Sequence, residues 1–331
     1  MDWLQKHWEE RTALRFLLIP ASWLYRLLAA ARRGCYKVGL MRVTRVPAPV
    51  IVVGNITVGG AGKTPLVLWL SKFLTERGLR PGIVLRGYGG HQVDSAVIAG
   101  PESDPAVVGD EALLLARNSS CPVFVSRNRS LAAQTLVREY DCNVILSDDG
   151  LQHYAMARDV EIAVIDGNRR FGNGQQLPAG PLRESPKRLL TVDICVVNGR
   201  PHTDELGMQV VGLAFRQVTA PETQQDTSAF RGQRVHAVAG IGCPDRFFSH
   251  LRDLGIEAKE HPFPDHYQFT ARDIEFNDDW VVIMTEKDAV KCEQLADQRH
   301  WYLAIEAKPD PKLGMLVLKL LKERSRGQEA A

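Results

Sequence analysis

A run of β-branched residues followed by a glycine-rich turn constrains the fold of this chain more than any other feature. From residue 50 to residue 65 the sequence reads VIVVGNITVGGAGKTP. The apolar run predicts a strand that is buried on both faces. The glycines predict a tight turn, and a helix is expected to begin at the Lys-Thr-Pro that follows. A strand, a glycine loop and a helix in this order predict a phosphate-binding P-loop in a parallel α/β sheet.

The chemistry of this loop points to a nucleotide and a magnesium ion. Backbone N–H groups of the turn and the start of the helix would surround phosphate oxygens. Lys63 would bring positive charge to the β- and γ-phosphates, and Thr64 would offer its hydroxyl to Mg²⁺. The first position of the usual pattern is glycine, whereas this chain has Thr57. We predict that ATP and Mg²⁺ are bound here, with these loop residues: Thr57, Val58, Gly59, Gly60, Ala61, Gly62, Lys63 and Thr64.

Two adjacent aspartates follow another predicted strand. Asp148 and Asp149 come directly after the mostly apolar residues 144–147. A P-loop protein commonly anchors Mg²⁺ a second time at the end of a neighbouring strand, so these carboxylates are predicted to join Thr64 in holding the metal or its water molecules. A solvated turn is the alternative interpretation of the pair.

A carboxylate at a predicted helix start is the candidate general base. Gly109-Asp110-Glu111 opens the predicted helix at 110–117. Phosphoryl transfer to a hydroxyl group commonly uses a carboxylate that accepts the hydroxyl proton. Capping of the helix by Asp110 is the alternative. His266 stands in a loop of the later part of the chain, where by itself it would be an ordinary surface residue.

Two arginines lie in loops that could contact phosphate. Arg183 belongs to a Gly- and Pro-rich irregular segment at residues 167–186, and Arg86 precedes Gly-Tyr-Gly-Gly after a predicted strand. A guanidinium group can bind a phosphate through two parallel hydrogen bonds. Ordinary surface ion pairs are the alternative for both.

Predicted strands and helices alternate along most of the chain, which indicates βαβ units and a mainly parallel sheet. The predicted strands are 50–53, 82–86, 122–126, 142–147, 160–166, 193–198, 235–239, 280–285 and 301–305, and the predicted helices are 63–77, 110–117, 130–140 and 312–324. A polar passage at 221–226 suggests a domain boundary. We expect an α/β fold with an N-terminal region at 1–45, a P-loop domain at 46–220 and a smaller α/β domain at 221–331.

The first 45 residues are basic and contain an amphipathic pattern. The longest uncharged run, 16–25, is about half of the roughly 20 residues that a membrane span requires. On a helical wheel one face is apolar and the other carries arginines, and the tryptophans at 3, 8 and 23 suit a helix that lies in a membrane interface. Packing of this helix on the protein's own core is the alternative. The formal net charge is only +2, which gives no indication of nucleic acid as a partner.

Taken together, these segments resemble the tetraacyldisaccharide 4'-kinase family, the lipid A 4'-kinases of Gram-negative bacteria. The matching segments run in order from residue 49 to residue 290, and they read VGNITVGGAGKTP, LRGYGG, VGDEALLLA, SDDGLQH, GNGQQLPAGPLRE, PDH and MTEKDAV. Family members often have Leu-Arg-Glu-Pro in the long loop, whereas here Ser185 stands before the proline.

The resemblance implies an activity and an acceptor. The family transfers the γ-phosphate of ATP to the 4'-hydroxyl of a tetraacylated glucosamine disaccharide 1-phosphate, giving lipid IV-A. It implies a peripheral protein on the cytoplasmic face of the bacterial inner membrane, with two α/β domains around a cleft.

It also implies roles for individual residues. Asp110 matches the catalytic carboxylate, His266 the histidine that supports it, and Arg183 an arginine near the transferring phosphate. The Mg²⁺-binding pair corresponds to Asp148 and Asp149, and the remaining candidates near the site are Arg86, Glu111, Gln152, His153 and the run at 285–288. Burial of Asp110 between the domains is expected to raise its pKa.

Two other functions are compatible with a P-loop. A membrane-associated switch ATPase of the partitioning type also has a Gly-Gly-x-Gly-Lys-Thr loop, but that class has lysine where this chain has Val58. A soluble P-loop ligase or kinase for a small metabolite would not need the amphipathic start.

Overall fold

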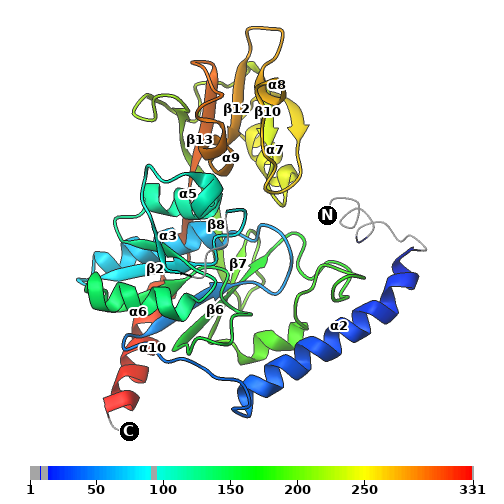
Figure 1. Ribbon diagram of the computed structural model, residues 1–331. Helices are drawn as coiled ribbons and strands as arrows, with labels where there is room; N and C mark the ends of the chain where they lie inside the picture. The colour runs from blue at the N-terminus through cyan, green and yellow to red at the C-terminus, as the bar shows by residue number, and fades with distance from the viewer. Residues whose placement is uncertain (1–7, 9–13, 91–94, 330–331) are drawn as a thin grey trace.

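A computed structural model describes residues 8, 14–90 and 95–329 of the chain. Its strands form a continuous sheet in the order β11-β10-β12-β13-β8-β7-β6-β1-β5-β2-β4-β3, with β9 added beside β8 (Figure 1). The strands are β1 (Val50–Gly54), β2 (Pro81–Leu85), β3 (Val97–Ala99), β4 (Val123–Val125), β5 (Val144–Ser147), β6 (Val160–Asp166), β7 (Ile194–Asn198), β8 (Leu206–Gln217), β9 (Gln224–Gln225), β10 (Arg234–Ala239), β11 (Glu257–Pro262), β12 (Val281–Thr285) and β13 (His300–Pro309).

Helices cover both faces of this sheet. The helices of the described residues are α2 (Leu14–Lys37), α3 (Lys63–Thr75), α4 (Pro105–Val108), α5 (Asp110–Asn118), α6 (Arg129–Glu139), α7 (Pro244–Asp253), α8 (Ala271–Ile274), α9 (Glu286–Cys292) and α10 (Lys312–Glu329), with a 3-10 helix η1 at Pro186–Thr191. The fold is therefore mixed α/β with a large, mostly parallel sheet, as predicted. The pairs β8–β13, β3–β4 and β8–β9 are antiparallel.

Strand β1 explains why the sequence before the P-loop is apolar throughout. It pairs in parallel with β5 on one side and β6 on the other. Ile51 and Val53 point into the core that α3, α5 and α10 cover, while Val50 and Val52 point into the core that α6 covers. Because side chains alternate between faces and both faces are buried, neither set can be polar.

Strand β8 was not predicted, and it links the two parts of the sheet. It pairs with β13 over most of its length, and Figure 1 shows these strands running from the larger part into the smaller one. Phe215 of β8 already packs with Phe230 and Trp301 in the core of the smaller part. The sheet thus continues past the boundary suggested at residue 220, and the division into 46–220 and 221–331 stays a prediction.

The predicted strands and helices occur where expected, and most of their ends differ by one or two residues. The exceptions are β13, which continues to Pro309, and α10, which continues to Glu329. The pairing with β8 extends β13 into a segment whose charged residues, Glu306 and Lys308, concealed it.

Helix α2 lies along the outside of the larger part (Figure 1). One side of it contacts the irregular loop, where the Ser22 hydroxyl donates to the Gln176 carbonyl at 2.8 Å and the Tyr25 hydroxyl donates to the Arg183 carbonyl at 3.2 Å. The other side exposes apolar residues, namely Leu17, Trp23, Leu24, Leu27 and Leu28. The apolar face is therefore not packed on the core of the described chain.

The structure does not agree with every part of the predicted interfacial helix. Trp8 is buried, and its indole N–H donates to the Pro178 carbonyl, so it is not free to face a lipid surface. Trp3 and Arg11 lie outside the described residues. Among the helices that the structure describes, none combines the length and apolar character needed to cross a bilayer.

Candidate active site

The P-loop lies at the carboxyl end of β1, where it leads into α3. Gly59 and Gly62 have φ angles of +100° and +92°, which favour glycine. A Cβ atom on Gly62 would come within 2.4 Å of the Asn198 side chain, so the position has no room for another residue. Asn198 in turn donates to the Ala61 carbonyl at 3.0 Å, and the Val58 N–H donates to the Pro181 carbonyl at 2.8 Å. Residues of β7 and of the irregular segment at 167–186 therefore fix the conformation of the P-loop.

The aspartate pair meets the P-loop because β5 is the parallel neighbour of β1. The Thr64 hydroxyl donates to Asp148 Oδ2 at 3.0 Å. Lys63 Nζ lies 3.7 Å from Asp149 Oδ1, and Arg183 Nη1 donates to Asp149 Oδ2 at 2.8 Å. Five predicted groups from three distant segments thus converge. Both cations meet at Asp149, which concentrates positive charge beside the glycine turn.

The two aspartates have opposite pKa shifts. Burial, reinforced by the charge of Glu111, raises the pKa of Asp148 to about 6. Burial acts in the same direction on Asp149, but the charges of Lys63 and Arg183 overcome it and hold the pKa of that carboxyl well below its usual range. Asp149 is also one of four non-glycine residues with positive φ among the described residues, at +46°. Strained backbone of this kind is concentrated at functional sites.

Asp110 and His266 form a dyad although 156 positions separate them in the chain. His266 Nδ1 lies 3.0 Å from Asp110 Oδ2, and the Glu111 N–H donates to Asp110 Oδ1 at 2.9 Å. Asp110 is only 5% exposed. Gly89, with φ at +87°, packs directly on the pair, since a Cβ atom there would lie 3.4 Å from His266 Nδ1. The helix-start interpretation of Asp110 accounts for the contact at Oδ1 alone.

The expected direction of the Asp110 pKa shift is wrong. Burial does raise the pKa of Asp110, but the hydrogen bond from His266 and the charges of Lys287 and His266 outweigh it, so the pKa is lowered overall. For His266, burial lowers the pKa, and the contacts with Asp110 and Asp265 overcome this and raise it. The compensating cation, Lys287, belongs to the run at 285–288 that the resemblance put near the site, but its contact with the dyad could not be predicted because it comes from a distant helix.

A cavity of about 1190 Å³ joins these groups. Its lining includes the P-loop from Val58 onward, both aspartates, His266 of the dyad, and residues of α2 such as Tyr25 and Arg32. Asp110 itself lies behind His266, which it contacts. Of the other predicted residues, the structure brings the following into the same cavity: Arg86, Glu111, Gln152, His153 and Arg183. We call this cavity the cleft.

Gln152 and His153 have different environments. Gln152 Nε2 donates to the Asn55 carbonyl at 3.0 Å and to Glu184 Oε1 at 2.8 Å, which ties the end of β1 to the irregular loop. Burial and the nearby charges of Arg129 and Arg158 lower the pKa of His153 to about 3, so its ring is neutral in the physiological range.

Sequence reasoning missed two polar residues that shape the cleft. Glu184 is buried and also accepts a hydrogen bond from the Tyr154 hydroxyl at 2.6 Å. Arg129, the first residue of α6, is 4% exposed and donates to the Ser147 hydroxyl at 3.0 Å, directly beside the aspartates. The local sequence does not indicate that the Arg129 side chain is buried, because an arginine at the start of a helix is usually solvated.

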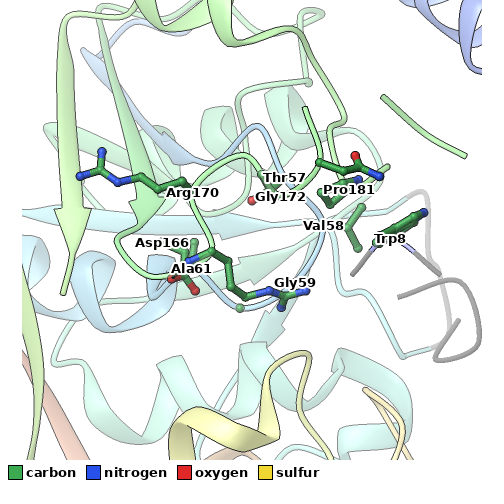
Figure 2. A pocket seen from close by; sticks show the side chains of 12 residues that line it. Trp8, Thr57, Val58, Gly59, Ala61, Asp166, Arg170, Gly172 and Pro181 are labelled. Carbon is green, nitrogen blue, oxygen red and sulfur yellow. Dashed lines mark hydrogen bonds between the residues drawn. The ribbon is translucent and has the colours of Figure 1, made fainter. Parts of the chain in front are cut away.

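A smaller hollow of about 500 Å³ lies on the outer side of the P-loop (Figure 2). Thr57 to Ala61 line it together with Asp166, the last residue of β6, and Arg170. Trp8 lies at the end beside Val58 and Pro181. The glycine turn is therefore accessible from two sides.

Metal ligation has to involve groups other than carboxylates and imidazoles alone. Among the described residues, no three His, Cys, Asp or Glu side chains are arranged so that they could hold a metal ion by themselves. A hydroxyl, one or two carboxylates and phosphate oxygens are a donor set that suits Mg²⁺. Thr64 and the aspartate pair provide the protein part of such a set.

A P-loop that faces paired aspartates, with a carboxylate–histidine dyad across the same cleft, defines a P-loop phosphotransferase. The family model of "Tetraacyldisaccharide-1-P 4'-kinase" (LpxK) matches residues 14–322. The chain belongs to this family, and the predicted assignment to tetraacyldisaccharide 4'-kinases of lipid A biosynthesis is confirmed.

Individual relatives agree with the family match. A tetraacyldisaccharide 4'-kinase of Nitrosococcus oceani is 47% identical over 321 residues, covering 97% of this chain and 95% of the relative. That of Aromatoleum aromaticum is 49% identical over 310 residues, covering 91% of each chain. A solved structure of an "apo" form of LpxK from Aquifex aeolicus in complex with ATP has a TM-score of 0.77 and 26% identity, covering 93% of this chain and 99% of that one. ATP binding is thereby shown for a homologous structure, and the partitioning ATPase and the small-metabolite kinase are set aside.

Proposed function

We propose that this chain transfers the γ-phosphate of ATP to the 4'-hydroxyl of a tetraacylated glucosamine disaccharide 1-phosphate, with Asp110 as the general base. The observation that carries the residue assignment is that His266, which contacts Asp110 at 3.0 Å, lines the cleft that the P-loop opens into. A hydroxyl bound between them would meet a proton acceptor on one side and a phosphate on the other. We also propose that segments 46–220 and 221–331 are the two domains that flank this cleft.

The reaction is a simple displacement. Asp110 accepts the proton of the 4'-hydroxyl while the hydroxyl oxygen forms a bond to the γ-phosphorus. The bond between that phosphorus and the oxygen bridging to the β-phosphate breaks, and ADP leaves with the bonding electrons. His266 donates from Nδ1 to Asp110 and holds its carboxylate in place. The product is a phosphate monoester at the 4' position.

Lys63 and Arg183 would act on the phosphates. Their charges converge at Asp149, beside the glycine turn whose N–H groups a nucleotide phosphate would meet. Charge that builds up on the transferred group is stabilised there by preorganised cations, which is the main way that proteins accelerate phosphoryl transfer.

The residues present fit a magnesium ion. Asp149 Oδ1 is a buried oxygen without a hydrogen-bond donor, and the Thr64 hydroxyl lies against Asp148. Thr64, Asp148 and Asp149 would hold the metal directly or through water molecules. When bound, Mg²⁺ neutralises charge on the β- and γ-phosphates.

The lipid acceptor requires the enzyme to work at a membrane surface, and we propose that α2 provides the contact. The apolar face of α2 continues into exposed Val38, Leu40, Met41 and Val43, and Leu190 of η1 is exposed nearby. Arg33 of α2 donates to the Thr191 hydroxyl at 3.2 Å, which places η1 beside the helix. Basic residues around an apolar face suit an anionic lipid surface. The proposed location is peripheral, on the cytoplasmic face of the bacterial inner membrane.

Two negative charges introduced by substitution on the apolar face of α2 should weaken the binding of the protein to lipid. We expect Leu24→Glu combined with Leu28→Glu to weaken binding to vesicles of phosphatidylethanolamine and phosphatidylglycerol about 100-fold, because burying a leucine side chain contributes roughly 1.5–3 kcal/mol. Co-sedimentation with vesicles measures this. Leu213→Glu combined with Met315→Glu is the matched control, since both residues are exposed elsewhere. Equal loss in both proteins would assign the effect to charge alone.

Transfer of labelled phosphate tests the proposed activity. The protein, γ-labelled ATP, Mg²⁺ and a detergent-dispersed tetraacyl disaccharide 1-phosphate should give label in the lipid and unlabelled ADP. Hydrolysis of ATP without labelled lipid would contradict the proposed acceptor.

A further inference from the structure

Lys287 is the cation closest to the dyad, and the proposed mechanism has not used it. It lies in the first turn of α9, the helix that follows β12 in the smaller part of the molecule. Its Nζ atom is 3.1 Å from Glu111 Oε1, 3.3 Å from Asp265 Oδ1 and 3.8 Å from Asp110 Oδ2. The side chain is 18% exposed, so three carboxylates surround an ammonium group that is largely shielded from water.

The same ammonium group contacts the imidazole of His266. Lys287 Nζ lies 3.5 Å from His266 Nε2. An ammonium group has three donors and no acceptor, so a favourable contact requires an unprotonated Nε2. The nearest alternative acceptor for a proton on Nε2 is Asp265 Oδ1 at 3.8 Å, beyond hydrogen-bond distance. The neutral ring therefore carries its proton on Nδ1, where it donates to Asp110.

The surrounding structure fixes the direction of Lys287. Asp288, the next residue, is fully buried and accepts from the Gly240 N–H and the Thr285 hydroxyl, which anchors the first turn of α9. Two further contacts join the two ends of α9 to α5, from Asn118 to Glu286 and from Arg117 to Glu293, the residue that follows α9. Lys287 thus reaches from an anchored turn of one part of the molecule to the dyad at the start of α5.

We propose that Lys287 is a positioning residue for phosphoryl transfer: it holds His266 with the proton on Nδ1, and so holds Asp110 as a hydrogen-bonded, accepting carboxylate. If the neutral His266 ring carried its proton on Nε2 instead, the lone pair on Nδ1 would face the Asp110 carboxylate and repel it. This inference rests on the proposed role of Asp110 as the base.

The charges around the dyad determine the direction of a pH effect. His266 faces Asp110 from α5, Asp265 from its own loop, Lys287 from α9 and the ring of Tyr88 from the glycine loop. Glu111 contacts Lys287, and the charge of Lys291 acts on Asp110. Lys287 lowers the pKa of both His266 and Asp110. Its removal raises both values, so a larger fraction of the dyad is protonated at a given pH and the acidic limb of the rate profile moves upward.

Lys287→Met and Lys287→Arg test this role, because methionine removes the charge and arginine keeps a cation without an acceptor. We expect Lys287→Met to lower kcat at pH 7 about 100-fold, within the range for general-base catalysis, and to move the acidic limb up by about one pH unit. The KM for ATP should change little, since Lys287 does not contact the P-loop. Lys287→Arg should return the limb close to its original pH.

NMR of the ¹⁵N-labelled histidines gives a readout that a purely structural role would not move. The unaltered protein should show His266 protonated at Nδ1, and Lys287→Met should show a mixture of the two tautomers. Lys291→Met is the control on the same helix, since Lys291 pairs with Asp288 at 2.7 Å and its charge lowers the pKa of Asp110 less than that of Lys287 does. It should change thermal stability while shifting the limb clearly less.

Several outcomes would overturn the proposal. Protonation of His266 at Nε2 in the unaltered protein would do so without any variant, and so would an unmoved limb in a folded Lys287→Met protein. Near-normal turnover of Asp110→Ala would instead remove the proposed base itself, so the two failures are distinguishable.

Discussion

Replacing Asp110 with alanine should lower kcat about 10³- to 10⁴-fold, at the upper end of what a general base contributes. The carboxylate belongs to the dyad whose histidine lines the cleft, and in the proposed mechanism it accepts the proton of the 4'-hydroxyl. The Kd for ATP should stay unchanged, because neither Asp110 nor His266 contacts Thr57–Thr64. Single-turnover transfer to the lipid measures the rate, and equilibrium binding of a labelled nucleotide measures the affinity.

Asp110→Asn refines this experiment by keeping the shape of the side chain. It should be as inactive as the alanine variant, since an amide cannot accept the proton. Asp104→Asn is the control, because Asp104 is exposed and only caps α4 through the Ala106 N–H. Near-normal turnover of Asp110→Asn would show that another group, or the phosphate itself, takes the proton.

Replacing Lys63 with alanine should impair ATP binding and turnover together. Loss of a preorganised charge that acts on the transferred group lowers kcat about 10²- to 10³-fold. The KM for ATP should also rise, because the same charge contacts the β- and γ-phosphates before transfer. Initial rates over a range of ATP concentrations separate the two effects.

Lys72→Ala provides the comparison for Lys63→Ala. Lys72 lies on the exposed side of the same helix, α3, and its removal should leave both parameters unchanged. If Lys63→Ala keeps the original kcat and KM, then the glycine turn does not bind the nucleotide phosphates as proposed.

Much of the site could be predicted from local sequence. Residues 50–65 specify a buried strand, a glycine turn and a helix start within one continuous segment, so their relative geometry follows from short-range sterics. The aspartates at the end of β5 could be assigned to the same edge because carboxyl ends of parallel strands meet there. For the same reason the alternation of strands and helices predicted the mixed α/β fold.

Local sequence does not reveal the partners of these groups, although the family resemblance paired His266 with Asp110. His266 contacts Asp110, and Lys287 contacts His266. Both contacts depend on the pairing of β8 with β13, which joins the smaller part of the sheet to the larger part that contains α5. Strand β8 has a mixed polar and apolar sequence that reveals neither its length nor its pairing. The pKa of Asp110 therefore had the wrong expected direction: sequence indicated that the carboxyl would be buried, but the cations that compensate burial come from segments more than 150 positions away.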